Sequence, residues 1–219
     1  MEVKIKRKLE MDNQKGKRKE QVVLAAIEVF KQKGIVNSKM TDIATKAEIG
    51  VATVYRYFNT KSELVIAAAT TLWEEKISIL FNKFDEPTFM ELNGADRVRT
   101  ILNIFVSVYQ KYPEFISFLE HFDNYIIKES IPLENLENYE IIIMDTKLAI
   151  FHAIDKGKKD GSIKSNMDND AFYITITHSL MSLSQKLILR GNILRSDSDI
   201  KGDTQLKLLI DMAMLYLVY

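Results

Sequence analysis

The segment Met40–Leu64, MTDIATKAEIGVATVYRYFNTKSEL, constrains the fold of this chain more than any other. Its pattern predicts a short helix, a tight turn at Glu48–Gly50 and a second short helix over 51–58. A longer third helix follows at once, because Thr60 and Glu63 form a T-x-x-E capping box. We therefore expect three helices that share a small apolar core.

The rest of the chain has the same helical character. Apolar residues recur at i, i+3, i+4 and i+7 along most of its 219 residues, and the chain contains only 8 Gly and 3 Pro. This pattern predicts an all-α protein. The predicted helices span residues 17–33, 38–47, 51–58, 60–84, 95–111, 113–129, 135–158, 168–190 and 203–218. Residues 1–15 are expected to form a flexible basic arm or a frayed helix, and 85–94 and 191–202 to form loops.

Charge is distributed unevenly along a chain whose formal net charge is zero. Residues 1–61 carry 14 Lys and Arg against 7 Asp and Glu, and residues 62–219 carry the opposite excess. A basic head of this kind attracts a polyanion, whereas the acidic body repels one. The chain has no Cys, which excludes disulfides and thiolate sites. No apolar signal segment or membrane span is recognisable, so we expect a cytoplasmic protein that does not bind a membrane.

The predicted helix 51–58 carries groups suited to a DNA groove. Val54 and Phe58, four residues apart, should face the core, which leaves the other side chains outside. Arg56 offers a fork of donors to guanine or phosphate. Val51 and Ala52 are small enough for close approach and can touch a thymine methyl group.

Hydroxyl and amino groups in the same region suit the phosphate backbone. Thr53, Tyr55 and Tyr57 offer hydroxyls to phosphate oxygens. Ser38, as an N-cap, Lys39 and Lys61 lie where helices are expected to begin, and free N–H groups there favour an anion. Ordinary half-buried tyrosines and a solvated basic face are the alternative. The coincidence of turn, hydroxyls and basic head favours double-stranded DNA as the partner.

The same residues closely resemble the helix-turn-helix of the TetR family of transcriptional regulators. The family pattern is roughly T-V-x-D-I-A-x-x-A-G-V-S-x-x-T-x-Y-x-x-F-x-S-K-E-x-L. The matching positions are Asp42, Ile43, Ala44, Ala47, Thr53, Tyr55, Phe58, Lys61, Glu63 and Leu64. Three positions depart from the pattern: Lys39 replaces Thr, Glu48 replaces Gly and Gly50 replaces Ser. Gly50 removes a hydroxyl N-cap from the helix 51–58, but Gly is an acceptable N-cap. If φ is positive at Glu48, the turn costs about 1–2 kcal/mol.

The resemblance implies a fold and a function for the whole chain. Residues 16–76 would be a helix-turn-helix DNA-binding domain, joined by a long helix to a larger ligand-binding and dimerisation domain over 77–219. The protein would be a homodimeric, ligand-responsive repressor on a near-palindromic operator. Ligand binding would tilt the long helix and change the spacing of the two DNA-binding heads.

The last two predicted helices support the dimer independently. Helices 168–190 and 203–218 are apolar most of the way round, and such a helix has to be covered on all sides. A second subunit is the simplest cover at the end of a small helical domain. A helix pair buried inside one subunit is the alternative.

The effector is expected to be an apolar or aromatic small molecule of unknown identity. The candidate pocket residues are Phe105, Tyr109, Phe118, His121, Phe122, Tyr125, Met144, Phe151 and His178. Aromatic residues and Met at helical spacing more often pack in a core, and this alternative stays open. The histidines do not have metal-ligand spacing, so no metal and no cofactor are expected.

Catalysis has no recognisable motif in this chain. The sequence lacks G-x-S-x-G, a P-loop and G-x-G-x-x-G. We therefore expect no catalytic residue and a protein that is not an enzyme. Two alternatives remain: a helical small-molecule-binding module that does not act through DNA, and an enzyme built on a helical bundle.

Overall fold

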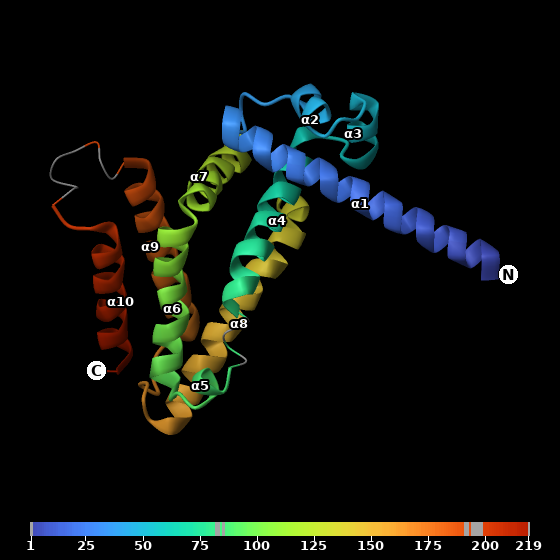
Figure 1. Cartoon of the computed structure of the whole chain (residues 1–219). Coiled ribbons are helices and arrows are strands. Elements are labelled where there is room, and N and C mark those ends of the chain that lie inside the picture. Colours follow the sequence, from blue (N-terminus) through green and yellow to red (C-terminus); the bar gives the residue numbers. More distant parts are fainter. Residues whose placement is uncertain (1, 82–83, 85, 191–192, 194–198, 219) are drawn as a thin grey trace. The chain divides into compact units, whose positions relative to one another are not determined.

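Every regular element in the described part of the chain is a helix, as the periodicity predicts (Figure 1). The computed structural model describes residues 2–81, 84, 86–190, 193 and 199–218. The helices are α1 (Glu2–Lys33), α2 (Met40–Lys46), α3 (Val51–Tyr57), α4 (Lys61–Phe81), α5 (Pro87–Met90), α6 (Gly94–Lys111), α7 (Pro113–Lys128), the 3₁₀ helix η2 (Leu133–Leu136), α8 (Glu137–Asp160), α9 (Asn169–Arg190) and α10 (Gly202–Val218).

Most helices begin and end within two residues of the predicted bounds, but α1 does not. It begins at Glu2, so the residues expected to form a flexible arm are helical in the structure. The physical reason is composition: Lys, Arg, Glu, Met and Leu favour a helix, and Gly16 is the only helix breaker before residue 34. The expected loop at 85–94 contains the short helix α5. Residues 1, 82–83, 85, 191–192 and 194–198 of the predicted segments lie outside the described residues.

The chain divides into two compact units. The N-terminal unit comprises Met1–Leu72 and His121–Tyr139, and the C-terminal unit comprises Trp73–Glu120 and Glu140–Tyr219. Helices α4, α7 and α8 each contribute residues to both units. The local sequence pattern did not indicate that 121–139 belong with the N-terminal helices.

The N-terminal unit is built around the apolar faces of α1 to α4. Its buried side chains include Val22, Ala26, Phe30, Ile43, Val54, Leu64 and Phe122. Phe122 comes from α7 and lies 4.9 Å, centroid to centroid, from the ring of Tyr139. The hydroxyls of Ser62 and Tyr125 hydrogen-bond at 3.0 Å, which ties α7 to the start of α4. Residues 121–139 therefore complete the core beneath the first four helices.

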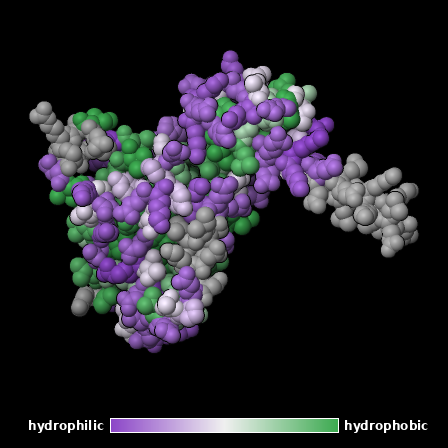
Figure 2. Space-filling view, viewed as in Figure 1, coloured by the Kyte–Doolittle hydropathy of each residue, from purple (hydrophilic) through white to green (hydrophobic). Residues whose placement is uncertain are grey.

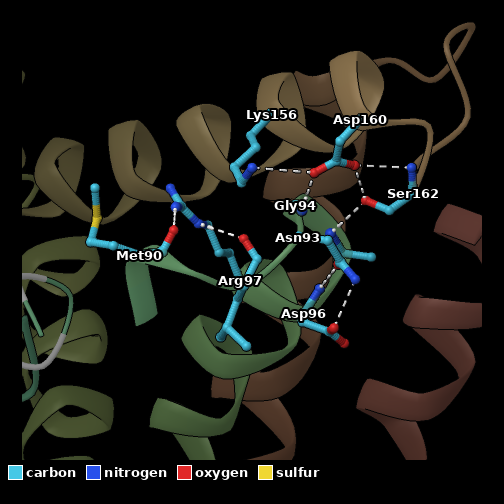
Figure 3. A network of polar contacts seen from close by, with 10 residues as sticks. Met90, Asn93, Gly94, Asp96, Arg97, Lys156, Asp160 and Ser162 are labelled. Carbon is cyan, nitrogen blue, oxygen red and sulfur yellow. Dashed lines mark hydrogen bonds and ion pairs between the residues drawn. The ribbon is translucent and has the colours of Figure 1, made fainter. Parts of the chain in front are cut away.

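The C-terminal unit has one apolar core shared by α6, α8, α9 and α10. At the start of α6, the backbone of Gly94 lies against Gly157 of α8, and a Cβ at position 94 would be only 2.0 Å from the Gly157 nitrogen. The Gly94 N–H donates to Asp160 at 2.9 Å, and the Ala95 N–H donates to the Ser162 hydroxyl at 3.0 Å (Figure 3). Asp160 at the end of α8 and Ser162 just after it thus satisfy two of the free N–H groups at the start of α6.

The same contacts stabilise the ionised form of Asp160. A hydrogen bond from the Ser162 hydroxyl, with further bonds from the Gly94 and Ser162 N–H groups and from Lys156, lowers the pKa of Asp160 to about 2. This carboxylate is therefore charged at every physiological pH.

No helix in the described part of the chain combines the length and the apolar character needed to cross a bilayer. Within the same ranges, no three His, Cys, Asp or Glu side chains come together in a way that could hold a metal ion.

Candidate nucleic-acid interface

The turn between α2 and α3 is a Schellman motif. The Ile49 N–H donates to the Ala44 carbonyl at 3.0 Å, and the Glu48 N–H donates to the Thr45 carbonyl at 3.2 Å. Both bonds satisfy carbonyls that the end of α2 would otherwise leave free. The chain then reverses into α3, whose N-cap is Gly50 as predicted.

Glu48 holds the strained position of this turn. Its φ is +54°, in the left-handed region that a Schellman motif requires after the helix end and that glycine usually occupies. The positive φ that the sequence analysis considered for Glu48 is therefore present. A residue with a Cβ at this φ lowers the stability of the turn relative to Gly.

The start of α2 differs from the prediction. Lys39, not Ser38, is the N-cap, and the backbone N–H of Lys39 donates to the Asp42 carboxylate at 2.9 Å. The prediction that Ser38 caps this helix is wrong, because its buried hydroxyl donates to the Gly34 carbonyl at the end of α1 instead. Hydrogen bonds from the Lys33 side chain and the Lys39 N–H lower the pKa of Asp42.

Helix α3 has one buried side and one open side. Val54 and Phe58 are buried, as predicted, among residues of α1 and α2 that are themselves buried. On the open side, Val51 and Tyr55 expose 38% and 49% of their surface. Ala52 and Arg56 are also exposed, whereas the predicted contacts Thr53 and Tyr57 are half-buried.

Arg56 is held beside an aromatic ring while its donors stay in solvent. Its guanidinium carbon lies 5.3 Å from the centroid of the Tyr57 ring, a cation–π contact. This contact restricts the side chain without occupying its N–H groups. The open side of α3 thus presents a restrained fork of donors beside small residues and a tyrosine hydroxyl.

Helix α4 begins close to α3 with its first turn capped. The Thr60 hydroxyl accepts a hydrogen bond from the Glu63 N–H at 3.1 Å, and the Glu63 carboxylate accepts one from the Asn59 N–H at 2.9 Å. The predicted capping residues are confirmed, although Glu63 caps the residue before Thr60.

Lys61, predicted to contact phosphate, also has a partner within the N-terminal unit. Its Nζ donates to the Val36 carbonyl at 3.0 Å and lies 5.7 Å from the centroid of the Tyr125 ring. Burial lowers the pKa of Lys61, and the charge of Glu129 opposes that shift. An ammonium group has three donors, so one bond to Val36 leaves capacity for an anion.

The predicted pocket residues are divided between the two units. His121, Phe122 and Tyr125 belong to the N-terminal unit, where Phe122 and Tyr125 are buried and His121 is exposed. In the C-terminal unit, Phe118 is buried and Met144 and His178 are exposed.

The three remaining pocket candidates, Phe105, Tyr109 and Phe151, are half-buried and pack against the core of the C-terminal unit. Phe151 meets Tyr173 edge to face at 6.1 Å. Burial, together with the charge of Asp203, raises the pKa of Tyr109. These contacts fit the alternative that these aromatic residues pack in the core. A ligand pocket in this part of the chain stays a prediction.

The N-terminal helices match the model of a known protein family. Residues 22–68 match the family model described as "Bacterial regulatory proteins, tetR family". The match covers α2, α3 and parts of α1 and α4, so the resemblance seen in the sequence is confirmed.

Curated relatives match less than half of the chain. The HTH-type transcriptional regulator LuxR of Vibrio harveyi is 29% identical over 92 residues, 42% of this chain and 43% of that protein. The HTH-type transcriptional repressor NicS of Pseudomonas putida is 25% identical over 107 residues, 48% of each chain. The chain thus spans less than half the length of these relatives.

Solved structures match nearly the whole chain. A TetR transcription regulator from Haloarcula marismortui superposes with a TM-score of 0.71 at 12% identity, over 93% of this chain and all of that one. The transcriptional regulator FadR from Bacillus subtilis, in complex with stearoyl-CoA, gives 0.64 at 15% identity, over 89% and 96%. At these identities the likeness shows the fold, an N-terminal helix-turn-helix with a larger helical C-terminal part.

Proposed function

Because residues 22–68 match the tetR-family domain, we propose that the chain is a transcriptional regulator that binds double-stranded DNA through α3. One observation carries the proposal: the open side of α3 holds Arg56 restrained but unburied, beside two small residues and Tyr55. An interior helix would bury that side. In the major groove it can read base edges through Arg56 and touch thymine methyl groups through Val51 and Ala52.

The remaining predicted residues contact the phosphate backbone in this proposal. Tyr55 and Lys39 are exposed, and Lys61 has donors left after its bond to Val36. Thr53 and Tyr57 are half-buried and can offer only their hydroxyl ends. Ser38 contributes through its backbone at most, since its hydroxyl is engaged with Gly34.

The regulator acts as a homodimer in this proposal, through α9 and α10. Helix α10 buries Leu206, Ile210, Met214 and Leu217 on one side, yet Leu208, Met212 and Leu215 expose 60%, 58% and 59% of their surface on the other. Figure 2 shows hydrophobic residues on the side of the molecule where α10 lies. A second copy would cover this stripe and place two α3 helices about 34–36 Å apart on a near-palindromic operator.

The C-terminal unit is the proposed effector-binding and dimerisation domain, and the effector is an apolar or aromatic small molecule. The support is the fold, since FadR of the same fold was solved with stearoyl-CoA. An effector that prefers one of two states by about 5.5 kcal/mol would move the regulator from 1:99 to 99:1. Repression rather than activation is proposed because the relative NicS is a repressor.

Selection from a random pool of duplexes tests this function. The full chain should enrich one near-palindromic sequence, and its affinity should fall steeply with salt, because each neutralised phosphate adds about 0.9 to the slope of log K against log salt. No enrichment and a flat salt response would contradict the proposal. Binding of small molecules without any DNA affinity would instead support a sensor module that does not act through DNA.

A further inference from the structure

The ammonium group of Lys61 lies against α7 as well as against the loop between α1 and α2. Its Nζ donates to the Val36 carbonyl at 3.0 Å and lies 5.7 Å from the centroid of the Tyr125 ring. Tyr125 is buried, and its hydroxyl forms a hydrogen bond with that of Ser62 at 3.0 Å. Two neighbouring residues at the start of α4 thus contact the same tyrosine of α7, which restricts where the Lys61 side chain can point.

An acidic residue, Glu129, follows one helical turn after Tyr125. The Glu129 N–H donates to the Tyr125 carbonyl at 2.9 Å, so the helical hydrogen bonding of α7 extends to this residue. Side chains four residues apart on a helix are neighbours on one face, with about 5–6 Å between their Cβ atoms. The exposed side chain of Glu129 therefore starts beside the ring that Lys61 contacts.

The negative charge of Glu129 acts on both partners of this contact. Burial lowers the pKa of the Lys61 ammonium, and the charge of Glu129 partly restores it. Burial raises the pKa of Tyr125, the hydrogen bond with Ser62 lowers it, and the charge of Glu129 raises it further. A single carboxylate close to both groups accounts for both effects, and it attracts the Lys61 ammonium toward the end of α7.

A phosphate group and the Glu129 carboxylate are attracted by the same ammonium group. Lys61 has donors left after its bond to Val36, and either anion can accept them. The carboxylate also repels a phosphate that approaches Lys61. A second acidic residue, Glu63 in the first turn of α4, is engaged differently, since its carboxylate accepts the Asn59 N–H at 2.9 Å.

We propose that Glu129 belongs to the DNA-binding site, where its carboxylate competes with phosphate for the Lys61 ammonium and weakens binding to every duplex alike. The inference rests on the proposed function, in which Lys61 contacts a phosphate. Base preference is unaffected, because a phosphate contact carries no direct sequence information. Tyr125 is a positioning residue in this arrangement, since its ring keeps the ammonium within reach of both anions.

A double-mutant cycle on the full chain tests this inference. Its four members are the wild type, Glu129→Gln, Lys61→Met and the combination of both changes. Each is titrated at low salt on the duplex that the wild-type chain selects and on a duplex of unrelated sequence. Glu134→Gln is the matched control, because Glu134 is also an exposed acidic residue of the N-terminal unit and its change alters the net charge equally. Far-UV circular dichroism checks that every variant is folded.

Glu129→Gln should strengthen binding to both duplexes by about two- to fivefold per subunit, the size typical of an exposed charge pair. The gain should vanish in the Lys61→Met background, and Glu134→Gln should bind like the wild type. No gain from Glu129→Gln, an equal gain from Glu134→Gln or a gain that persists without Lys61 would overturn the inference alone. A wild-type chain that binds no duplex would overturn the proposed function, and the inference with it, before any variant is compared.

Discussion

At the scale of single residues, Glu48 sets the geometry of the turn and is strained there. Its φ of +54° disfavours any residue with a Cβ, and its side chain is exposed. Glu48→Gly should therefore raise the free energy of unfolding by about 1 kcal/mol, measured by chemical denaturation. Glu20→Gly is the matched control, because the same change inside α1 should lower it by about 1 kcal/mol. Destabilisation by Glu48→Gly would show that this carboxylate has a stabilising partner.

Lys61 has two roles that one mutation tests: it bonds the Val36 carbonyl within the N-terminal unit, and it is proposed to contact phosphate. Lys61→Met keeps the apolar stem over Tyr125 but removes the donor to the Val36 carbonyl. We expect the free energy of unfolding to fall by about 1 kcal/mol and the affinity for all DNA sequences to fall alike. Binding to a panel of duplexes measures the second effect. An altered base preference would refute phosphate contact as the role of Lys61.

The sequence predicts single residues well where the rule is local. Spacing within one or two turns predicts Gly50 as an N-cap, the burial of Val54 and Phe58, and the capping pair Thr60 and Glu63. Ser38 could not be assigned in this way. Its hydroxyl could cap the helix after it or bond the helix end before it, and only the path of the chain decides between these partners.

At the scale of elements, the junction of α6 and α8 depends on the absence of a side chain at Gly94. A Cβ there would overlap the Gly157 backbone, which cannot move aside as a flexible side chain could. Gly94→Ala should lower the thermal midpoint and reduce the free energy of unfolding by about 1–3 kcal/mol. Gly16→Ala is the matched control, since a Cβ at Gly16 meets nothing within 4 Å, and it should raise helix content. A neutral Gly94→Ala would contradict the close approach of the two helices.

Helix bounds were largely predictable, but helix partners were not. Periodicity placed α6, α9 and α10 within one residue at each end. It gave no sign that residues 121–139 would complete the core of the N-terminal unit. Three of the nine predicted pocket residues lie in that segment. An amphipathic pattern tells which side of a helix is buried, not against which part of the chain.

At the scale of the whole molecule, the exposed apolar stripe on α10 should decide the oligomeric state. Leu208→Glu with Leu215→Glu should convert a dimer into a monomer, measured by analytical ultracentrifugation, because two carboxylates would have to be buried in the interface. The α8 variant Leu148→Glu with Ile141→Glu is the control, since these residues are also exposed and apolar. A monomer from the α8 variant alone would place the interface on α8.

DNA reading by the open side of α3 is best tested by base-resolved selection with the variant Arg56→Ala. The wild-type chain and the variant are each used to select duplexes from the same random pool. We expect the variant to lose about 1–3 kcal/mol of binding free energy on the preferred sequence and to relax its choice at one base pair in each half-site. If the variant keeps the wild-type base preference at every position of the site, α3 does not read DNA through Arg56.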